Sequence, residues 1–473
     1  MRLQALLLVG LAAAVGSPLE AQTDAYVKRG AVQREASVWE LKRGGPLRHG
    51  NFWVQEAECG APVAAGGRLV VRLDMGGVEV RPGASDRMEC RVRLGVAAGS
   101  EQEARQLLGR YALTAKRVTG GGVYIGGNLT GDADRNRPWS VTFRIQVPAR
   151  FNVDIETEGG GIEVERLNGE LRAATAGGDI RTGDVTGPVR AETAGGNIEL
   201  GSIGQRLEAR TAGGCVTVGD VKGDAVLETS GGQIIAGRIE GSVRAETAGG
   251  DIILRSARTE IVATTAGGQI RIGEGGGSVR AETSGGSILL SAARGPIRVE
   301  TAGGSINLYR IQGAIQATTA AGKIFAQIAA KPETFAASEL ETAFGDIEVY
   351  LPPDLALTID ATIEMAAGHK ILTDFPLQIE DGEPRYQPAV VRGRGPVNGG
   401  GQILRIRTVG GNIEIRKLTP ALLESLQQKQ QWLWEQWQEK EKMRLERERL
   451  REQQRQKRRE KEVKREQEPP SPF

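Results

Sequence analysis

Apolar and polar residues alternate through the middle of the chain in a pattern that repeats every 18 residues. Each repeat is marked by a threonine, in most units two residues before a Gly-Gly pair. The ten marker threonines are Thr157, Thr175, Thr193, Thr211, Thr229, Thr247, Thr265, Thr283, Thr301 and Thr319. Because they keep one spacing without an insertion, they are strong evidence for a repeat architecture.

Within a unit the apolar positions alternate with polar ones, which is typical of strands. Around Thr247, for example, Val243, Ala245, Ile252 and Leu254 are apolar, and the residues between them are mostly Arg, Glu, Asp, Asn, Gln or Ser across the units. Eighteen residues are too few for two strands and a crossover helix. The pattern therefore predicts an all-β parallel β-solenoid in which each unit is one coil, stacked about 4.8 Å from the next.

The polar positions predict a charge-balanced outer face rather than a reactive one. Glu192 precedes a marker threonine, and Arg190 lies two residues before it on the same face of the strand. The same pair recurs in other units, so we expect a solvated ladder of opposite charges with a structural role. We expect the threonines to hydrogen-bond along the stack, and Gly195 and Gly196 to form a corner where a Cβ would clash.

The pattern divides the chain into five parts. Residues 1–21 read as a secretory signal peptide, because Arg2 precedes an apolar run that is too short to span a membrane. We expect N-terminal strands, a short helix and a cap on the first coil in 22–150, regular coils in 151–330, and irregular closing coils with long loops in 331–418. Residues 419–473 are expected to form a charged helical arm with a disordered tip.

Some details can be predicted for the flanking parts. Residues 69–80 resemble one coil, Ser100 to Glu103 form a capping box before a helix of about ten residues, and 122–125 and 139–147 are strand-like. After the regular repeats the template returns around Thr342 and Thr408. Loops are expected between them, the largest being an extended excursion from Glu380 to Gly401.

The C-terminal arm is predicted to be a long charged helix. Thr419 and Pro420 are suited to the first positions of a helix, and residues 421–466 contain neither Gly nor Pro. No heptad is kept, so a solvated single helix and a coiled coil both remain open. Trp432, Trp434 and Trp437 either pack on the last coil or contact a partner or a membrane surface.

Charge and cysteine content narrow the class of protein. The net charge of +2 gives no case for nucleic acid. Residues 438–468 hold 13 Lys and Arg against 9 Asp and Glu, so the arm is basic. Three cysteines fit an exported protein that is not rich in disulfides. Cys59 and Cys90 are candidates for a disulfide, and Cys215 is expected to be a free, partly exposed thiol.

No motif for catalysis, cofactors or metals is found in the sequence. The glycine pairs lack the spacing of a phosphate-binding loop, and they join strand to strand rather than strand to helix. No serine lies in a Gly-x-Ser-x-Gly elbow, and the residue after Gly-Gly is too variable for a calcium ladder. We therefore predict no enzyme activity, no cofactor and no metal.

The motifs resemble those of the bacterial putative-adhesin family, whose members are secreted or envelope-exposed β-solenoids. The resemblance rests on the "TAGG-x-I" coils, on "IEVYLPPDLALTIDA" and on the closing "NGGGQILRIRTVGGNIEIRK", and it spans about Phe52 to Lys417. It implies a β-solenoid exposed in the cell envelope and carries over no catalytic residue. The charged arm lies outside it.

Together these observations predict an exported, non-enzymatic β-solenoid that acts as an adhesin-like or scaffold surface in the bacterial envelope. Its expected partner is a protein or glycan of the periplasm, outer surface or extracellular space, with peripheral membrane contact through the arm. Two alternatives remain open. One is a β-solenoid enzyme acting on polysaccharide, and the other is an envelope-stress or membrane-associated component recruited through the arm.

Overall fold

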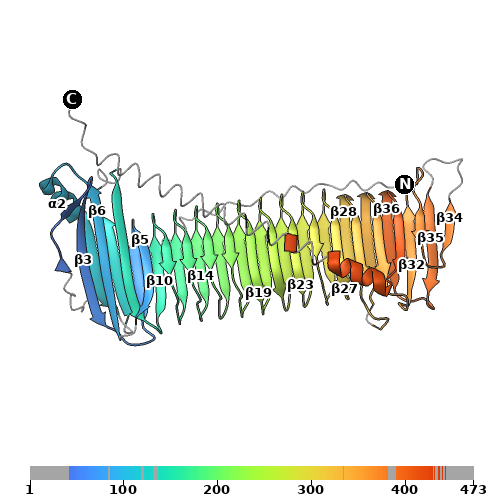
Figure 1. Ribbon diagram of the computed structural model, residues 1–473, viewed down its shortest axis with the longest axis horizontal. Coiled ribbons are helices and arrows are strands. Elements are labelled where there is room, and N and C mark those ends of the chain that lie inside the picture. Colours follow the sequence, from blue (N-terminus) through green and yellow to red (C-terminus); the bar gives the residue numbers. More distant parts are fainter. Residues whose placement is uncertain are drawn as a thin grey trace, which may run out of the picture. The chain divides into compact units, whose positions relative to one another are not determined.

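Each 18-residue unit forms two short strands joined by the Gly-Gly corner. The computed structural model describes residues 42–83, 86–118, 122–131, 137–333, 335–381, 390–429, 431, 435, 436, 439 and 443. All of them belong to one compact unit, Trp39–Phe473. The first strand of a coil ends at the marker threonine, and the second begins five residues after it. The strands fall into two sheets, A and B, so that each coil contributes one strand to each (Figure 1).

Among the described residues, sheet A has 19 strands and sheet B has 18. In stacking order, sheet A contains β1 (Lys42–Arg43) and β2 (Leu47–His49), which both pair with β3 (Phe52–Pro62), followed by β6 (Arg87–Ala97), β9 (Trp139–Pro148), β5 (Gly77–Gly83), β11 (Ile162–Val164), β13 (Ile180–Thr182), β15 (Ile198–Leu200), β17 (Val216–Val218), β19 (Ile234–Ile239), β21 (Ile252–Ala257), β23 (Ile270–Gly275), β25 (Ile288–Leu290), β27 (Ile306–Ile311), β29 (Ile324–Ile328), β31 (Ile347–Leu351), β37 (Ile413–Lys417) and β33 (Ile371–Thr373). Sheet B contains β7 (Tyr111–Val118), β8 (Gly122–Leu129), β4 (Arg68–Leu73), β10 (Asn152–Thr157), β12 (Leu171–Thr175), β14 (Val189–Thr193), β16 (Leu207–Thr211), β18 (Ala225–Thr229), β20 (Val243–Thr247), β22 (Ile261–Thr265), β24 (Val279–Thr283), β26 (Ile297–Thr301), β28 (Ile315–Ala321), β30 (Ser338–Phe344), β36 (Ile403–Gly410), β32 (Leu357–Ile363), β35 (Val391–Val397) and β34 (Gln378–Asp381).

Successive coils pair in parallel and in register, which confirms the predicted parallel β-solenoid. Val243 of β20 lies opposite Ile261 of β22, and Ile252 of β21 lies opposite Ile270 of β23, both at the 18-residue offset. The predicted inward positions form the core, with Ala245 and Ile252 each 0% exposed. Alanine between larger neighbours keeps the two sheets close, because it fills little of the space between them.

The marker threonines link each coil to the one before it. The Thr247 hydroxyl donates a hydrogen bond to the carbonyl of Gly232 in the preceding coil at 2.9 Å, and it accepts one from the amide of Gly250 at 3.2 Å. Donation to the preceding corner recurs from Thr157 to Thr408. The threonines are buried, so these bonds satisfy corner groups that water cannot reach. The prediction that they hydrogen-bond along the stack is confirmed.

The two glycines of a corner have different surroundings. A Cβ on Gly196 would overlap the carbonyl oxygen of Gly178 in the preceding coil, whereas a Cβ on Gly195 would lie 3.9 Å from the nearest oxygen atoms. The predicted clash is therefore confirmed for the second glycine and is wrong for the first. The close approach of stacked backbones, rather than a left-handed φ, requires glycine at the second position.

At the N-terminal end the coils do not stack in chain order. The coil of β8 and β9 lies outside the coil of β4 and β5, which pairs with β10 and β11 on its other side. Antiparallel β6 and β3 then extend sheet A, and antiparallel β7 extends sheet B. These antiparallel strands cover the edge of the parallel stack (Figure 1). The predicted strands at 122–125 and 139–147 are confirmed.

The predicted short helix belongs to the same end. Helix α2 (Glu101–Arg110) has ten residues, and the Ser100 hydroxyl accepts a hydrogen bond from the amide of Glu103 at 3.2 Å. The Glu103 carboxylate in turn accepts one from the amide of Gly99 at 2.9 Å. Leu107 and Leu108 of α2 are buried in the core. The helix begins where the capping box predicts, and it has the expected length of about ten residues.

The C-terminal end also departs from chain order. The coil of β36 and β37 lies between the coil of β30 and β31 and the coil of β32 and β33. The interval between Thr342 and Thr408 thus holds a complete coil. The expected excursion from Glu380 to Gly401 includes β35, which pairs antiparallel with β32, so the prediction of a loop is wrong for that strand. Residues 382–389 lie outside the described residues.

The predicted long C-terminal helix is supported only over its first turns. The described helical residues run from 420 to 429, with single helical positions up to 443. The Thr419 hydroxyl accepts a hydrogen bond from the amide of Leu422 at 3.3 Å, as expected of a helix cap. The rest of the arm lies outside the described residues, as do the expected signal peptide and the disordered tip.

Candidate functional site

The outer face of sheet B is occupied by ion pairs within and between coils. Arg190 contacts Glu192 at 2.7 Å in its own coil and Glu208 of the next coil at 3.5 Å. Arg210 contacts Glu228 of the following coil at 2.8 Å. The predicted pairs also form at Arg244–Glu246, Arg280–Glu282 and Arg298–Glu300. Exposed pairs of this kind contribute little stability each, and they leave these carboxylates in structural contacts.

At several corners the Asp, Asn or Ser after the Gly-Gly pair forms a second ladder. The Asp179 carboxylate accepts a hydrogen bond from the amide of Asn197 at 2.8 Å, and the Asn197 side chain accepts one from the amide of Cys215 at 2.9 Å. At the last coils the amide of Asn412 and the ammonium of Lys323 lower the pKa of the Asp346 carboxyl. Where the residue is Asp, Asn or Ser, its side chain accepts a hydrogen bond from the amide of the next coil.

The two cysteines predicted to pair lie opposite each other. Cys59 of β3 faces Cys90 of β6 across an antiparallel pair, and both are buried free thiols in this structure. The hydrogen bond with Cys59, together with burial, raises the pKa of the Cys90 thiol. Directly opposed residues of antiparallel strands have Cα separations of about 4.5–5.5 Å, within the range of disulfides. The disulfide stays a prediction. Cys215 is a half-buried free thiol, as predicted.

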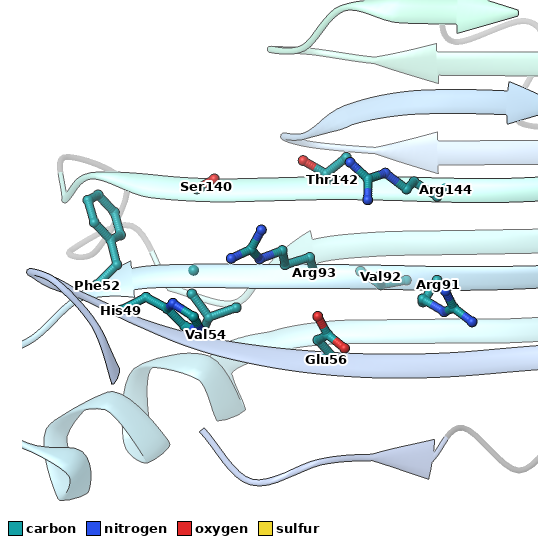
Figure 2. A pocket seen from close by; sticks show the side chains of 11 residues that line it. His49, Phe52, Val54, Glu56, Arg91, Val92, Arg93, Ser140, Thr142 and Arg144 are labelled. Atoms are coloured by element: carbon teal, nitrogen blue, oxygen red, sulfur yellow. The ribbon is translucent and has the colours of Figure 1, made fainter. Parts of the chain in front are cut away.

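A groove of about 410 Å³ lies on the outer face of sheet A at its antiparallel end. Its lining comes from β2, β3, β6 and β9. The register of the last three strands fixes two cross-strand rows: Glu56, Arg93 and Thr142 form one, and Val54, Gly95 and Ser140 form the next. Its lining residues are His49, Phe52, Val54, Glu56, Arg91, Val92, Arg93, Gly95, Ser140, Thr142 and Arg144. Figure 2 shows Arg93 between the side chains of β9 and those of β3.

Gly95 gives the groove its depth. A Cβ at this position would lie 3.3 Å from the Cβ of Ser140 and 3.8 Å from the Phe52 ring. Any larger side chain would therefore fill the space between Phe52 and Ser140. The half-buried ring of Phe52 and the hydroxyls of Ser140 and Thr142 form the walls.

The groove is lined by three guanidinium groups with different partners. Arg91 contacts Glu58 at 3.2 Å, and Arg144 contacts Glu79 at 3.0 Å. Within the part of the chain that the structure describes, no carboxylate lies within 4.0 Å of Arg93. An exposed guanidinium in a hollow, beside an aromatic ring and hydroxyl groups, is suited to a carboxylate-bearing ligand.

The groove cannot be recognised from the sequence alone. Its residues come from β2, β3, β6 and β9, which lie far apart along the chain and follow no repeat. The run "MECRVRLG" (residues 88–95) carries the only local signal, since its alternation puts Arg91, Arg93 and Gly95 on one face. The face itself becomes a groove only through pairing with β3 and β9.

The outer face of sheet A also carries apolar residues where polar ones are expected. The position six residues after the marker threonine is exposed and charged at Glu163, Arg181 and Glu199. From β19 onward it includes Ile235, Ile253, Leu289 and Phe325. The expectation of a polar outer face is therefore wrong for this part of sheet A.

Within the described residues, no group of three His, Cys, Asp or Glu side chains is arranged to hold a metal ion. None of their helices has the length and hydropathy needed to cross a bilayer. Trp432, Trp434 and Trp437 lie outside the described residues, so their predicted contacts stay predictions.

Comparison with known proteins found similarity only among solved structures. No family model matches the chain, and no curated protein matches it. A crystal structure of a putative adhesin from Bacteroides fragilis is 13% identical with a TM-score of 0.26, and the match covers 52% of this chain and 96% of that one. A putative cell adhesion protein from Clostridium sporogenes is 9% identical with a TM-score of 0.14, covering 77% and 100%.

Proposed function

We propose that this chain is an exported, non-enzymatic adhesin-like protein whose N-terminal groove binds an acidic glycan of the cell envelope. The observation that supports this proposal is that Arg93 lies in a groove of about 410 Å³ and has no carboxylate partner among the described residues. The repeated arginines at Arg190, Arg244, Arg280 and Arg298 are instead paired with glutamates. The coils thus serve as a scaffold, and the departure from the repeat provides the contact surface.

The groove offers both parts that recognition of an acidic sugar needs. A guanidinium can donate two parallel hydrogen bonds to a carboxylate, and it remains charged at every physiological pH. Phe52 presents an apolar surface against which the face of a sugar ring can pack, while Ser140 and Thr142 can bond its hydroxyls. Because the guanidinium groups are exposed, binding should weaken as salt is added.

Calorimetric titration of the full chain with an oligogalacturonate tests this proposal, with a neutral chitooligosaccharide as the comparison ligand. We expect binding of the acidic ligand only, and at least a ten-fold loss of affinity in Arg93→Ala, about 1.4 kcal/mol. Arg280→Ala on the outer face of sheet B is the matched control and should bind as the native chain does. Equal binding by all three proteins, or none, would contradict the groove, and shortened oligosaccharide products would contradict the absence of catalysis.

A further inference from the structure

Apolar residues lie on the outer face of sheet A in six of seven consecutive coils, and Arg271 occupies the row in the coil of β23. These apolar residues form the outer stripe, which is defined by Ile235 on β19, Ile253 on β21, Leu289 on β25, Tyr309 on β27, Phe325 on β29 and Tyr350 on β31. Tyr309 and Phe325 have ring centroids 4.9 Å apart, and those of Phe325 and Tyr350 are 5.4 Å apart. The corresponding face of sheet B carries Arg and Glu instead. Apolar residues gathered on an outward face are a candidate contact site.

Two residues of the stripe are buried, and the other four are half-buried. Ile253 points outward between the core residues Ile252 and Leu254, yet it is only 2% exposed. Tyr309 is 4% exposed, and Gln327, on the same face, is 1% exposed. Burial also lowers the pKa of Arg271, whose position in β23 lies between Ile253 and Leu289 in the same row. Packing of the aromatic rings on one another buries part of this row, and a segment lying over the row would account for the burial of Ile253.

The C-terminal helix begins next to the stripe. It follows β37, which pairs with β31 at the stripe's end, and the amide of Leu418 donates a hydrogen bond to the carbonyl of Leu351 at 2.7 Å. In its described part Leu426 is 8% exposed although it lies outside the solenoid core. One face of this short helix is thus packed against protein.

The helix has an apolar face of matching length. Leu422, Leu426, Leu433 and Trp437 are spaced by 4, 7 and 4 residues, which puts them on one side of an α-helix. From Leu422 to Trp437 a helix rises about 23 Å at about 1.5 Å per residue. From β31 to β21 the stack rises about 24 Å at about 4.8 Å per strand. Beyond Trp437 the arm is charged, and beyond Ile235 the row becomes Thr217 and Glu199.

We infer that residues 422–437 continue as a helix across the outer face of sheet A and dock their Leu and Trp side chains on the outer stripe. The occupant of the stripe is therefore the chain's own arm, running back along the stack from β31 toward β21. The tryptophans then pack along the flank of the coils rather than on the end of the stack. The basic segment from residue 438 onward leaves the solenoid near its middle.

Photo-crosslinking of the full chain tests the position of the arm. p-Benzoylphenylalanine in place of Leu289 lies about 14 Å from β31, three strand spacings away, so the nearest part of the arm is about ten residues beyond Leu422. We expect the crosslink within one chain, to the tryptic peptide of residues 430–440. The same probe in place of Arg280, on sheet B, should give none. A crosslink between two chains, or none to residues 418–440, would overturn the inference.

Proteolysis provides a readout that does not depend on the probe. Ile253→Asp with Leu289→Asp should speed tryptic cleavage after Lys429 at least ten-fold, because cleavage follows the population of the undocked arm. Val262→Asp, half-buried on the outer face of sheet B, is the control and should change nothing. The circular dichroism of the coils should persist in both. Unchanged cleavage, with protection of Lys429 only by phosphatidylglycerol vesicles, would assign the arm to a membrane surface and overturn the inference.

Discussion

At the scale of single residues, two glycines that look equivalent in the sequence have different roles. The second glycine of a corner lies under the carbonyl of the coil before it, whereas the first has room for a methyl group. The backbone spacing between coils, and not the turn itself, therefore fixes the choice of residue. This distinction can be read only from the distance between stacked strands.

Exchange of Gly195 and Gly196 for alanine measures this difference. Gly196→Ala should destabilise the solenoid by about 3 kcal/mol, because the new Cβ must push two coils apart. Gly195→Ala should change the free energy of unfolding by less than about 0.5 kcal/mol. Denaturant unfolding followed by circular dichroism compares the two. Equal losses would show that the corner needs glycine for its conformation.

The marker threonine beside the corner provides hydrogen-bond partners for two backbone groups. Thr247 satisfies the carbonyl of Gly232 and the amide of Gly250 at once. Without its hydroxyl both backbone groups would be buried and unpaired, which costs about 1–3 kcal/mol for each. The sequence predicts this role because threonine recurs at a position that alternation assigns to the inside, where a hydroxyl needs a partner.

At the scale of the strand, alternation decides which side chains enter the core. Ile252 is 0% exposed, and its neighbour Asp251 lies at the corner, where its carboxylate accepts a hydrogen bond from the amide of Gln269 at 2.8 Å. Serine can make the same bond, since the Ser287 hydroxyl accepts one from the amide of Ser305 at 3.2 Å. The two positions therefore tolerate very different changes.

Ile252→Asp and Asp251→Ser test the assignment of inside and outside. The first puts an unpaired carboxylate into the core and should cost more than about 4 kcal/mol, enough to open the stack. The second keeps an acceptor at the corner and should cost less than about 1 kcal/mol. Thermal melts of both variants check this order. The reverse order would mean that β21 presents its other face to the core.

The outer stripe cannot be predicted from the sequence of the individual strands. Ile235, Ile253 and Leu289 each occupy an outward position that is polar in the first coils. A single apolar residue on a strand face is common and carries no signal by itself. Only the stacking of several coils brings these residues onto one surface, and only the structure shows that Ile253 is buried there.

At the scale of the whole molecule, the sequence predicts the architecture but not the order of its ends. The coil that contains Thr408 could stack at any position along the solenoid. The alternation of apolar and polar residues specifies which side chains face the core, but not which coils are neighbours. The insertion of β36 and β37 before β32 and β33 is decided by long-range pairing. The groove cannot be predicted for the same reason, since only the register of three distant strands places Arg93 in one row with Glu56 and Thr142.

If the coils serve only as a scaffold, a change in their number should leave the affinity of the groove for its ligand unchanged. Deletion of residues 176–211 removes two complete coils and joins Thr175 to Ala212 in register. The lost strands β13 to β16 belong to the part of the stack whose outer row is charged, so both the groove and the outer stripe are kept. Each coil contacts only its neighbours, so the shortened stack should still fold.

The most direct test of the account is the affinity of this shortened chain for an oligogalacturonate, measured by titration calorimetry beside the full chain and its Arg93→Ala variant. The account predicts that the shortened chain binds within about two-fold of the full chain, and that Arg93→Ala binds at least ten-fold more weakly, about 1.4 kcal/mol. A folded shortened chain that has lost binding, beside an Arg93→Ala variant that retains it, would place the ligand on the coils and contradict the account.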